Sequence, residues 1–197
     1  MMSLSATNGR MNRWSRRLAL LLAVLTFPLI WVGGLVTTTD AGMAVPDWPN
    51  TYGYNMFLYP WKSWLPGPWD LFIEHGHRLL GALVGMVTIA LMVVVLKTDA
   101  RSWMRKLVIV ALVAVIAQGI LGGVRVRLND VTLAMIHGCT GPAFLVLTTI
   151  IAVMFSTFWQ NPVSPELSAA EAENKNEQNE DSEVIEDDKQ HFNASLR

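Results

Sequence analysis

Four long stretches of the sequence carry no formal charge: residues 18–39, 79–96, 107–124 and 131–165, the last staying apolar as far as Trp159. A helix that crosses the roughly 30 Å hydrocarbon core of a bilayer needs about 20 apolar residues, within a range of about 17–25. All four stretches meet this requirement. A helical bundle folded in water would interrupt such runs with charges, so we predict an all-α membrane protein with four transmembrane helices.

The first stretch follows a cluster of arginines, as the core of a secretory signal peptide does. Its apolar part is longer than the roughly 7–15 residues of such a core, and no small-residue cleavage site follows it. We therefore expect it to be a retained membrane span.

Charge divides the chain into three regions. Residues 1–165 hold 12 Lys and Arg against 6 Asp and Glu, whereas residues 166–197 hold 3 against 10. We predict a basic arm (1–17), a four-span bundle (18–159) and an acidic tail (160–197) too poor in apolar residues to fold alone. With 52% apolar and only 16% charged residues, the whole chain is neither disordered nor built to bind nucleic acid through a basic surface.

Lys and Arg near the span ends set the expected orientation. The basic arm and the connection 97–106 lie on the same side of a four-span protein, and each carries four positive charges. The connection 40–76 carries only Lys62. By the positive-inside rule, both termini are expected on the cytoplasmic side of an inner (cytoplasmic) membrane, with 40–76 as a long outer loop.

The outer loop is rich in aromatic residues and proline. It contains all three tyrosines, four of the eight tryptophans and five of the nine prolines. Amphipathic rings favour the lipid headgroup layer, so one interpretation is an interfacial belt. The other is a folded lid over a site at the outer end of the bundle, which the unusual length of the loop favours.

Two histidines fall at comparable depth on spans that run inward from the outer side. His77 is at the start of the second span, and His137 lies about two turns into the fourth. Ionisable residues inside a span are costly and usually functional. Such a pair could hold the iron of a planar tetrapyrrole from both sides, bind another metal, or only hydrogen-bond neighbouring helices.

Several charged residues lie close to these histidines in the sequence or near the same membrane surface. Glu74 shares a helix face with His77 if the second helix begins early. Arg78, Arg125 and Arg127 are near the outer surface. Guanidinium groups bind carboxylates in a bidentate manner, so these arginines are candidates for heme propionates, with lipid headgroups as the alternative.

Together these features resemble the heme A synthase family. The similar segments are Gly33-Gly34-Leu35-Val36-Thr37, Asp40-Ala41-Gly42-Met43-Ala44-Val45-Pro46-Asp47-Trp48-Pro49, Glu74-x-x-His77-Arg78, and Gly122-Gly123-x-Arg125-Val126 followed by His137. Members oxidise a methyl group of heme O to the formyl group of heme A for the assembly of terminal cytochrome oxidases. The resemblance implies a heme O monooxygenase-type oxidoreductase with His77 and His137 as axial iron ligands and Glu74 beside the reacting methyl group.

The resemblance covers residues 18–158, which correspond to one four-helix half. Typical members have two halves, the second holding heme b through its own histidine pair. The resemblance therefore implies a homodimer or a separate protein supplying the second half, with an electron donor that the sequence does not identify. Two other functions remain open: a membrane electron carrier that binds heme b, and an assembly protein without catalytic activity.

Overall fold

The computed structural model describes residues 12–160 and contains four long helices: α1 (Arg13–Thr38), α3 (Trp69–Thr98), α4 (Ser102–Leu128) and α5 (Val131–Met154). All four are long and apolar enough to cross a membrane, which confirms the predicted all-α fold and its four membrane helices. Three short helices, η1 (Met56–Leu58), α2 (Trp61–Trp64) and α6 (Thr157–Gln160), complete the described elements. The predicted acidic tail lies almost entirely outside the described residues.

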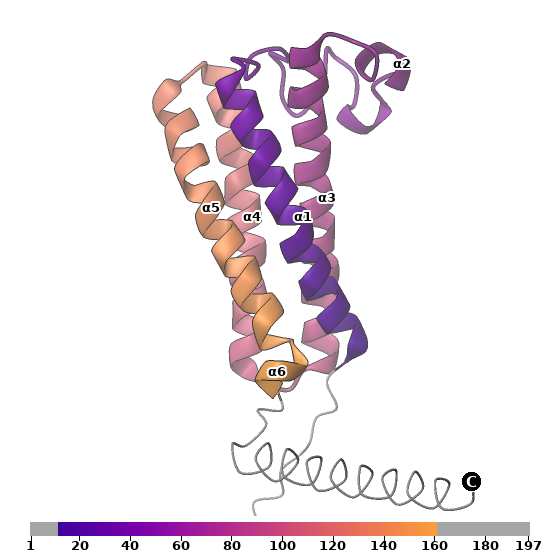
Figure 1. The fold of residues 1–197 in the computed structure, drawn as a ribbon, viewed down its shortest axis with the longest axis vertical. Helices are drawn as coiled ribbons and strands as arrows, with labels where there is room; N and C mark the ends of the chain where they lie inside the picture. The colour runs from indigo at the N-terminus through magenta and orange to yellow at the C-terminus, as the bar shows by residue number, and fades with distance from the viewer. Residues whose placement is uncertain (1–11, 161–197) are drawn as a thin grey trace, which may run out of the picture. The chain divides into compact units, whose positions relative to one another are not determined.

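The long helices run alternately up and down (Figure 1). α1 packs against α3 and α5, and α4 packs against the same two helices, so α3 and α5 face each other across the bundle. Short connections make the reversals from α3 to α4 and from α4 to α5. Asn129 ends α4 with a positive φ of 48°, and the side chain of Asp130 accepts a hydrogen bond from the Leu133 N–H to begin α5.

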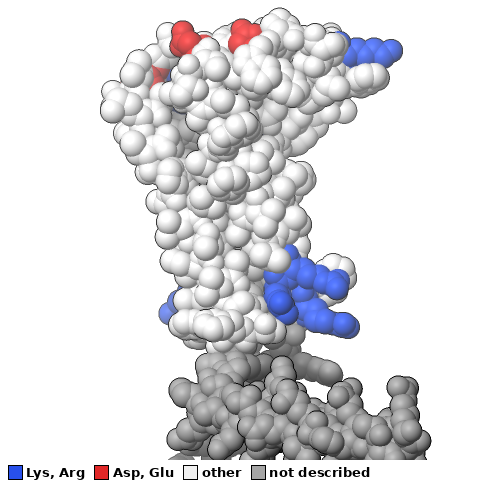
Figure 2. All heavy atoms as spheres, in the orientation of Figure 1, with Lys and Arg blue, Asp and Glu red and all other residues white. Residues whose placement is uncertain are grey.

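The bundle has two different ends. At the turn end, which carries the α3–α4 connection, side chains such as Leu22, Leu91, Met104 and Ile151 form a buried apolar core. At the loop end, residues 39–68 cover the bundle (Figure 1). On the face shown in Figure 2, basic side chains gather towards the turn end, while acidic side chains and a further basic side chain lie at the loop end. The orientation was predicted from the Lys and Arg residues alone.

The second long helix begins earlier than the charge-free run suggested. The span was expected to begin at Leu79, but α3 begins at Trp69, so residues 69–76 are helical and the connecting loop is 39–68. Pro68 immediately precedes the helix and Asp70 lies in its first turn, where proline and acidic residues favour a helix start. The charged residues Glu74 and Arg78 therefore mark where the apolar span ends, but the helix itself continues beyond them. With 30 residues α3 is about 45 Å long, more than the hydrocarbon core requires.

Candidate functional site

The rings of His77 and His137 meet inside the loop end of the bundle. They come from the facing helices α3 and α5, and their centroids are 6.3 Å apart with an angle of 83° between the ring planes. The Nδ1 atoms of both rings are buried, and neither has a hydrogen-bond partner within the described part of the chain. Unsatisfied buried nitrogen atoms are rare in folded proteins, and a bound ligand would satisfy these two.

Two glycines on the other helices make room for these rings. A Cβ added at Gly33 of α1 would lie 2.9 Å from Cε1 of His77, and a Cβ added at Gly122 of α4 would lie 3.1 Å from Cε1 of His137. A Cβ at Gly34 would meet nothing within 4 Å, and the same is true at Gly119. The close approach is therefore specific to the two glycines that face the histidines.

The donor set fits the iron of a tetrapyrrole better than a metal held by side chains alone. No group of three or more His, Cys, Asp and Glu residues is gathered for a metal among residues 12–160. A tetrapyrrole supplies four ligands itself and needs only two from the protein. The imidazoles of His77 and His137, whose centroids lie 6.3 Å apart, would supply these two ligands.

Glu74 and Arg78 form a buried ion pair on the first turns of α3. Arg78 Nη2 lies 2.6 Å from Glu74 Oε1, and the other oxygen of Glu74 accepts a hydrogen bond of 2.8 Å from the Val45 N–H. Glu74 is only 2% exposed. The carboxylate is thus held at both oxygens, one by its own helix and one by the loop.

Arg78 also binds the loop backbone directly. Its Nη1 donates to the carbonyl oxygens of Asp47 (2.7 Å) and Asn50 (3.1 Å), and its Nη2 donates to that of Val45 (2.6 Å). Residues 41–54, called the cap below, are therefore fastened to α3. Both terminal nitrogens of Arg78 are used in this way, so Arg78 holds the cap in place.

The cap also contacts α4. The indole of Trp48 packs so closely on Gly123 that a Cβ there would overlap it, and Arg127 Nη1 donates to the Trp48 carbonyl oxygen at 3.3 Å. Arg125 lies against the cap backbone, because a Cβ at Gly42 would be 2.9 Å from its Nη1. Arg125 interacts electrostatically with both site histidines, and its buried Nε has no partner among the described residues.

The cap is braced internally by Asp47. Its two carboxylate oxygens accept hydrogen bonds of 2.8 Å from the N–H groups of Tyr52 and Gly53, and the Tyr52 hydroxyl donates to the Ala44 carbonyl oxygen. Partial burial would raise the pKa of Asp47. The hydrogen bonds from the backbone N–H groups of Gly53, Tyr52 and Asp47 itself, together with the positive charge of Arg78, outweigh burial, so the pKa lies below its ordinary value of 3.8.

We expect the cap to loosen in acid. A carboxylate whose pKa is lowered by folding stabilises the folded state when the pH is above the pKa of the unfolded chain. This stabilisation is lost as the pH falls through the pKa of the folded state, which for Asp47 lies below about 4. Hydrogen exchange of the Tyr52 and Gly53 amides measured across this range should show the loss. In Asp47→Asn the exchange rates of the same two amides should no longer show this acid-dependent increase in opening. If the increase stays unchanged, a group other than Asp47 causes it.

The fit between glycines and histidines gives a second prediction. Gly33→Ala and Gly122→Ala should push the facing imidazoles out of position and lower the amount of heme that the purified protein retains. The matched controls are Gly34→Ala and Gly119→Ala, whose added methyl groups enter open space and should be neutral or slightly stabilising. The heme-to-protein absorbance ratio measures the effect. Equal ratios in all four variants would contradict the role of Gly33 and Gly122 in making room for the histidine rings.

The structure brings the predicted residues into one region, with different contacts for each. His77 and His137 converge as expected, and Glu74 lies one turn before Arg78 on the same helix. The sequence did not reveal the pairing of Gly33 and Gly122 with the rings or the packing of Trp48 on Gly123. These residues belong to the segments that resemble the family, but nothing in those segments shows which residues contact one another, and small residues are common in membrane helices.

The comparisons with known proteins identify the family of the chain. Residues 69–179 match the COX15-CtaA family, described as cytochrome oxidase assembly proteins, and this match covers more than half of the chain, from α3 onwards. No curated protein and no solved structure gave a match. Both site histidines, Glu74 and the three arginines fall inside the matched residues. The chain belongs to the COX15-CtaA (heme A synthase) family of cytochrome oxidase assembly proteins.

Proposed function

We propose that this chain oxidises the methyl group of heme O to the formyl group of heme A, acting as a homodimer or with a partner that supplies a second four-helix half. The observation that carries the proposal is the His77–His137 pair, whose rings face each other with unsatisfied nitrogen atoms inside a membrane bundle. Family membership supports the same substrate, because the members of this family are heme A synthases.

In this proposal the histidines and the arginines bind different parts of heme O. His77 and His137 ligate the iron and fix the macrocycle between α3 and α5. Arg125, whose Nε is unsatisfied, is the best placed of the three predicted arginines to bind a propionate. Arg127 has one long hydrogen bond to the cap and remains a second candidate, whereas Arg78 is already bound to the cap and Glu74. The heme itself supplies the iron redox chemistry.

The cap and Glu74 control the surroundings of the reacting group. Trp48 packs on α4 and the cap is hydrogen-bonded to α3, so the cap would shield a bound substrate from water. Glu74 is proposed to lie near the reacting methyl group, where its carboxylate would stabilise positive charge or carry a proton. Its hydrogen bonds to Arg78 and the Val45 N–H hold the carboxylate in one orientation.

Glu74→Gln should retain heme but lose formyl product, by at least about 100-fold if the carboxylate acts in proton transfer. The change keeps the size of the side chain and removes its charge. The matched control is Asp70→Asn. Asp70 is an exposed carboxylate one turn earlier on α3, and within residues 12–160 it accepts a hydrogen bond only from the neighbouring Leu71 N–H. Mass analysis of the extracted heme gives the result, and undiminished heme A would remove Glu74 from the chemistry.

The test of the proposed function is the identity of the bound heme. We would purify the protein from cells that make heme O and identify the extracted heme by mass. Heme O or heme A, absent from His77→Ala and His137→Ala, would support the proposal. Heme b alone would favour the electron carrier, which uses the same histidine pair. A folded preparation without heme would favour an assembly protein without catalytic activity.

A further inference from the structure

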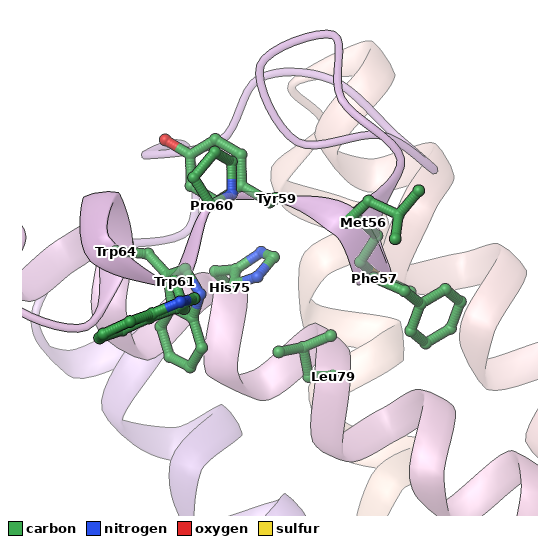
Figure 3. A pocket seen from close by; sticks show the side chains of 9 residues that line it. Met56, Phe57, Tyr59, Pro60, Trp61, Trp64, His75 and Leu79 are labelled. Carbon is green, nitrogen blue, oxygen red and sulfur yellow. The ribbon is translucent and has the colours of Figure 1, made fainter.

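A second histidine of α3 lies in a different pocket. His75 is two residues from His77, so the two side chains leave the helix on nearly opposite sides. His75 is 1% exposed and lines a cavity of about 310 Å³ between α3 and the loop (Figure 3). The other lining residues are mainly aromatic or apolar: Met56, Phe57, Leu58, Tyr59, Pro60, Trp61, Trp64 and Leu79. Neither the proposed heme site nor the family resemblance uses this pocket.

Aromatic rings hold His75 in place. Its ring centroid lies 5.3 Å from that of Tyr59 and 4.9 Å from that of Trp64. Thr51, which is fully buried, places its hydroxyl 3.1 Å from Nδ1 of His75. No hydrogen bond to Nε2 of His75 occurs among residues 12–160, so this nitrogen is left for a ligand in the cavity.

The His75–Thr51 pair can present either hydrogen-bonding role to a ligand. When the Thr51 hydroxyl donates to Nδ1, Nε2 carries the ring proton and donates; when Nδ1 donates to the hydroxyl, Nε2 accepts. The switch requires only a change of tautomer and a rotation of the hydroxyl, with no change in charge. Such a pair suits a ligand oxygen that exists both as a carbonyl and as a hydroxyl.

The rim of the pocket faces an apolar environment. Phe57, Leu58, Trp61 and Leu65 are all more than half exposed, and Lys62 lies 5.5 Å from the centre of the Trp61 ring. Exposed tryptophan beside lysine is typical of the layer between lipid tails and headgroups. A ligand would therefore enter from the membrane. The cavity is at the small end of the range for ligand pockets, enough for one substituted ring.

We propose that this pocket binds the ring of a membrane quinone or quinol. The aromatic walls stack on a flat ring, His75 meets the ring oxygen, and the apolar rim admits the hydrocarbon tail. A fatty acyl chain would leave Nε2 of His75 without a hydrogen-bond partner. A phosphate headgroup would need a Lys or Arg inside the cavity, and the lining residues include neither. The bound ring would lie on the opposite side of α3 from the proposed heme site, and its binding does not depend on heme.

Photolabelling tests the proposal on the full-length protein in nanodiscs. A photoreactive azidoquinone with a short alkyl tail should label residues 56–79 saturably, and unlabelled decyl-substituted benzoquinone should compete. His75→Phe keeps the aromatic packing but lacks the nitrogen, and Thr51→Val keeps the shape but lacks the hydroxyl. Each should weaken competition about three- to tenfold, the value of one neutral hydrogen bond. Unchanged affinity in both variants, or equal competition by a fatty acid, would overturn the proposal.

His77→Ala separates this inference from the proposed function. That variant should lose heme and still be labelled at residues 56–79. Loss of quinone labelling in His77→Ala with the fold intact would mean that the pocket belongs to the heme site, and would overturn the inference of a separate site. Failure to find heme in the wild-type protein would leave the labelling result unaffected.

Discussion

Replacing His77 or His137 with alanine should remove most of the bound heme and the absorption spectrum of iron ligated by two imidazoles. In the proposed function each ring would supply one ligand to the iron, and the two ring centroids lie 6.3 Å apart. Even residues that only orient metal ligands cost about 10–100-fold in affinity when replaced, so loss of a ligand itself should cost at least that much. Heme-to-protein ratio and visible spectra of the purified variants measure the effect.

Two controls distinguish ligation from packing. His191→Ala removes a histidine from the predicted tail, outside the described residues, and should leave the heme spectrum unchanged. Added imidazole should restore heme binding and the spectrum to His77→Ala, because it can occupy the space left by the side chain. If both alanine variants keep the wild-type spectrum, the histidines contribute only to helix packing and the proposed function loses its main support.

The membrane helices were predictable because hydrocarbon requires long apolar runs, and every predicted span corresponds to a helix. The start of α3 was not predictable in the same way, because a span defined as an uninterrupted apolar run ends at the first charged residue, whereas the helix continues past it. Glu74 and Arg78 are charges that neutralise each other inside the structure, so they lie within the helix without cost to its continuity. Proline at position 68 was the better sign of where the helix begins.

The two interpretations of the loop each describe one part of it. The cap (41–54) folds over the bundle and contacts α3 and α4, as expected of a lid. The segment 56–65 exposes Phe57, Leu58 and Trp61, as expected of an interfacial belt. Aromatic content alone could not separate the two parts. The difference depends on long-range packing, such as that of Trp48 on Gly123, which leaves no local pattern in the sequence.

The convergence of His77 and His137 was predictable from their depth on two spans running in the same direction. The partners of the arginines were not. Arg78 binds three backbone carbonyls, and a carbonyl is present at every residue, so no residue type marks its partners in the sequence. Both guanidinium groups can bind oxygen atoms. That of Arg78 binds the backbone of the cap and stabilises the fold, whereas Nε of Arg125 has no partner among the described residues and can bind a ligand.

Arg78→Ala should detach the cap from the bundle. The substitution removes four hydrogen bonds and leaves Glu74, which is 2% exposed, as a buried carboxylate without its cation. Breaking a buried ion pair from one side costs about 3–5 kcal/mol, enough to open a segment that has little apolar core of its own. Hydrogen exchange of residues 41–54 should rise sharply, while helical content stays constant because the buried apolar core lies at the turn end.

Three matched variants separate the functions of Arg78. Arg127→Ala removes a single 3.3 Å hydrogen bond to the same cap and should raise exchange only modestly. Arg78→Lys keeps the positive charge but cannot fork between several carbonyls, so it should restore Glu74 pairing without restoring cap protection. Glu74→Gln combined with Arg78→Met leaves no charge at either of these two positions, and the global stability lost in Arg78→Ala should partly return while the cap stays open. Full cap protection in Arg78→Ala would show instead that the contacts of Trp48 with α4 are sufficient to hold the cap closed.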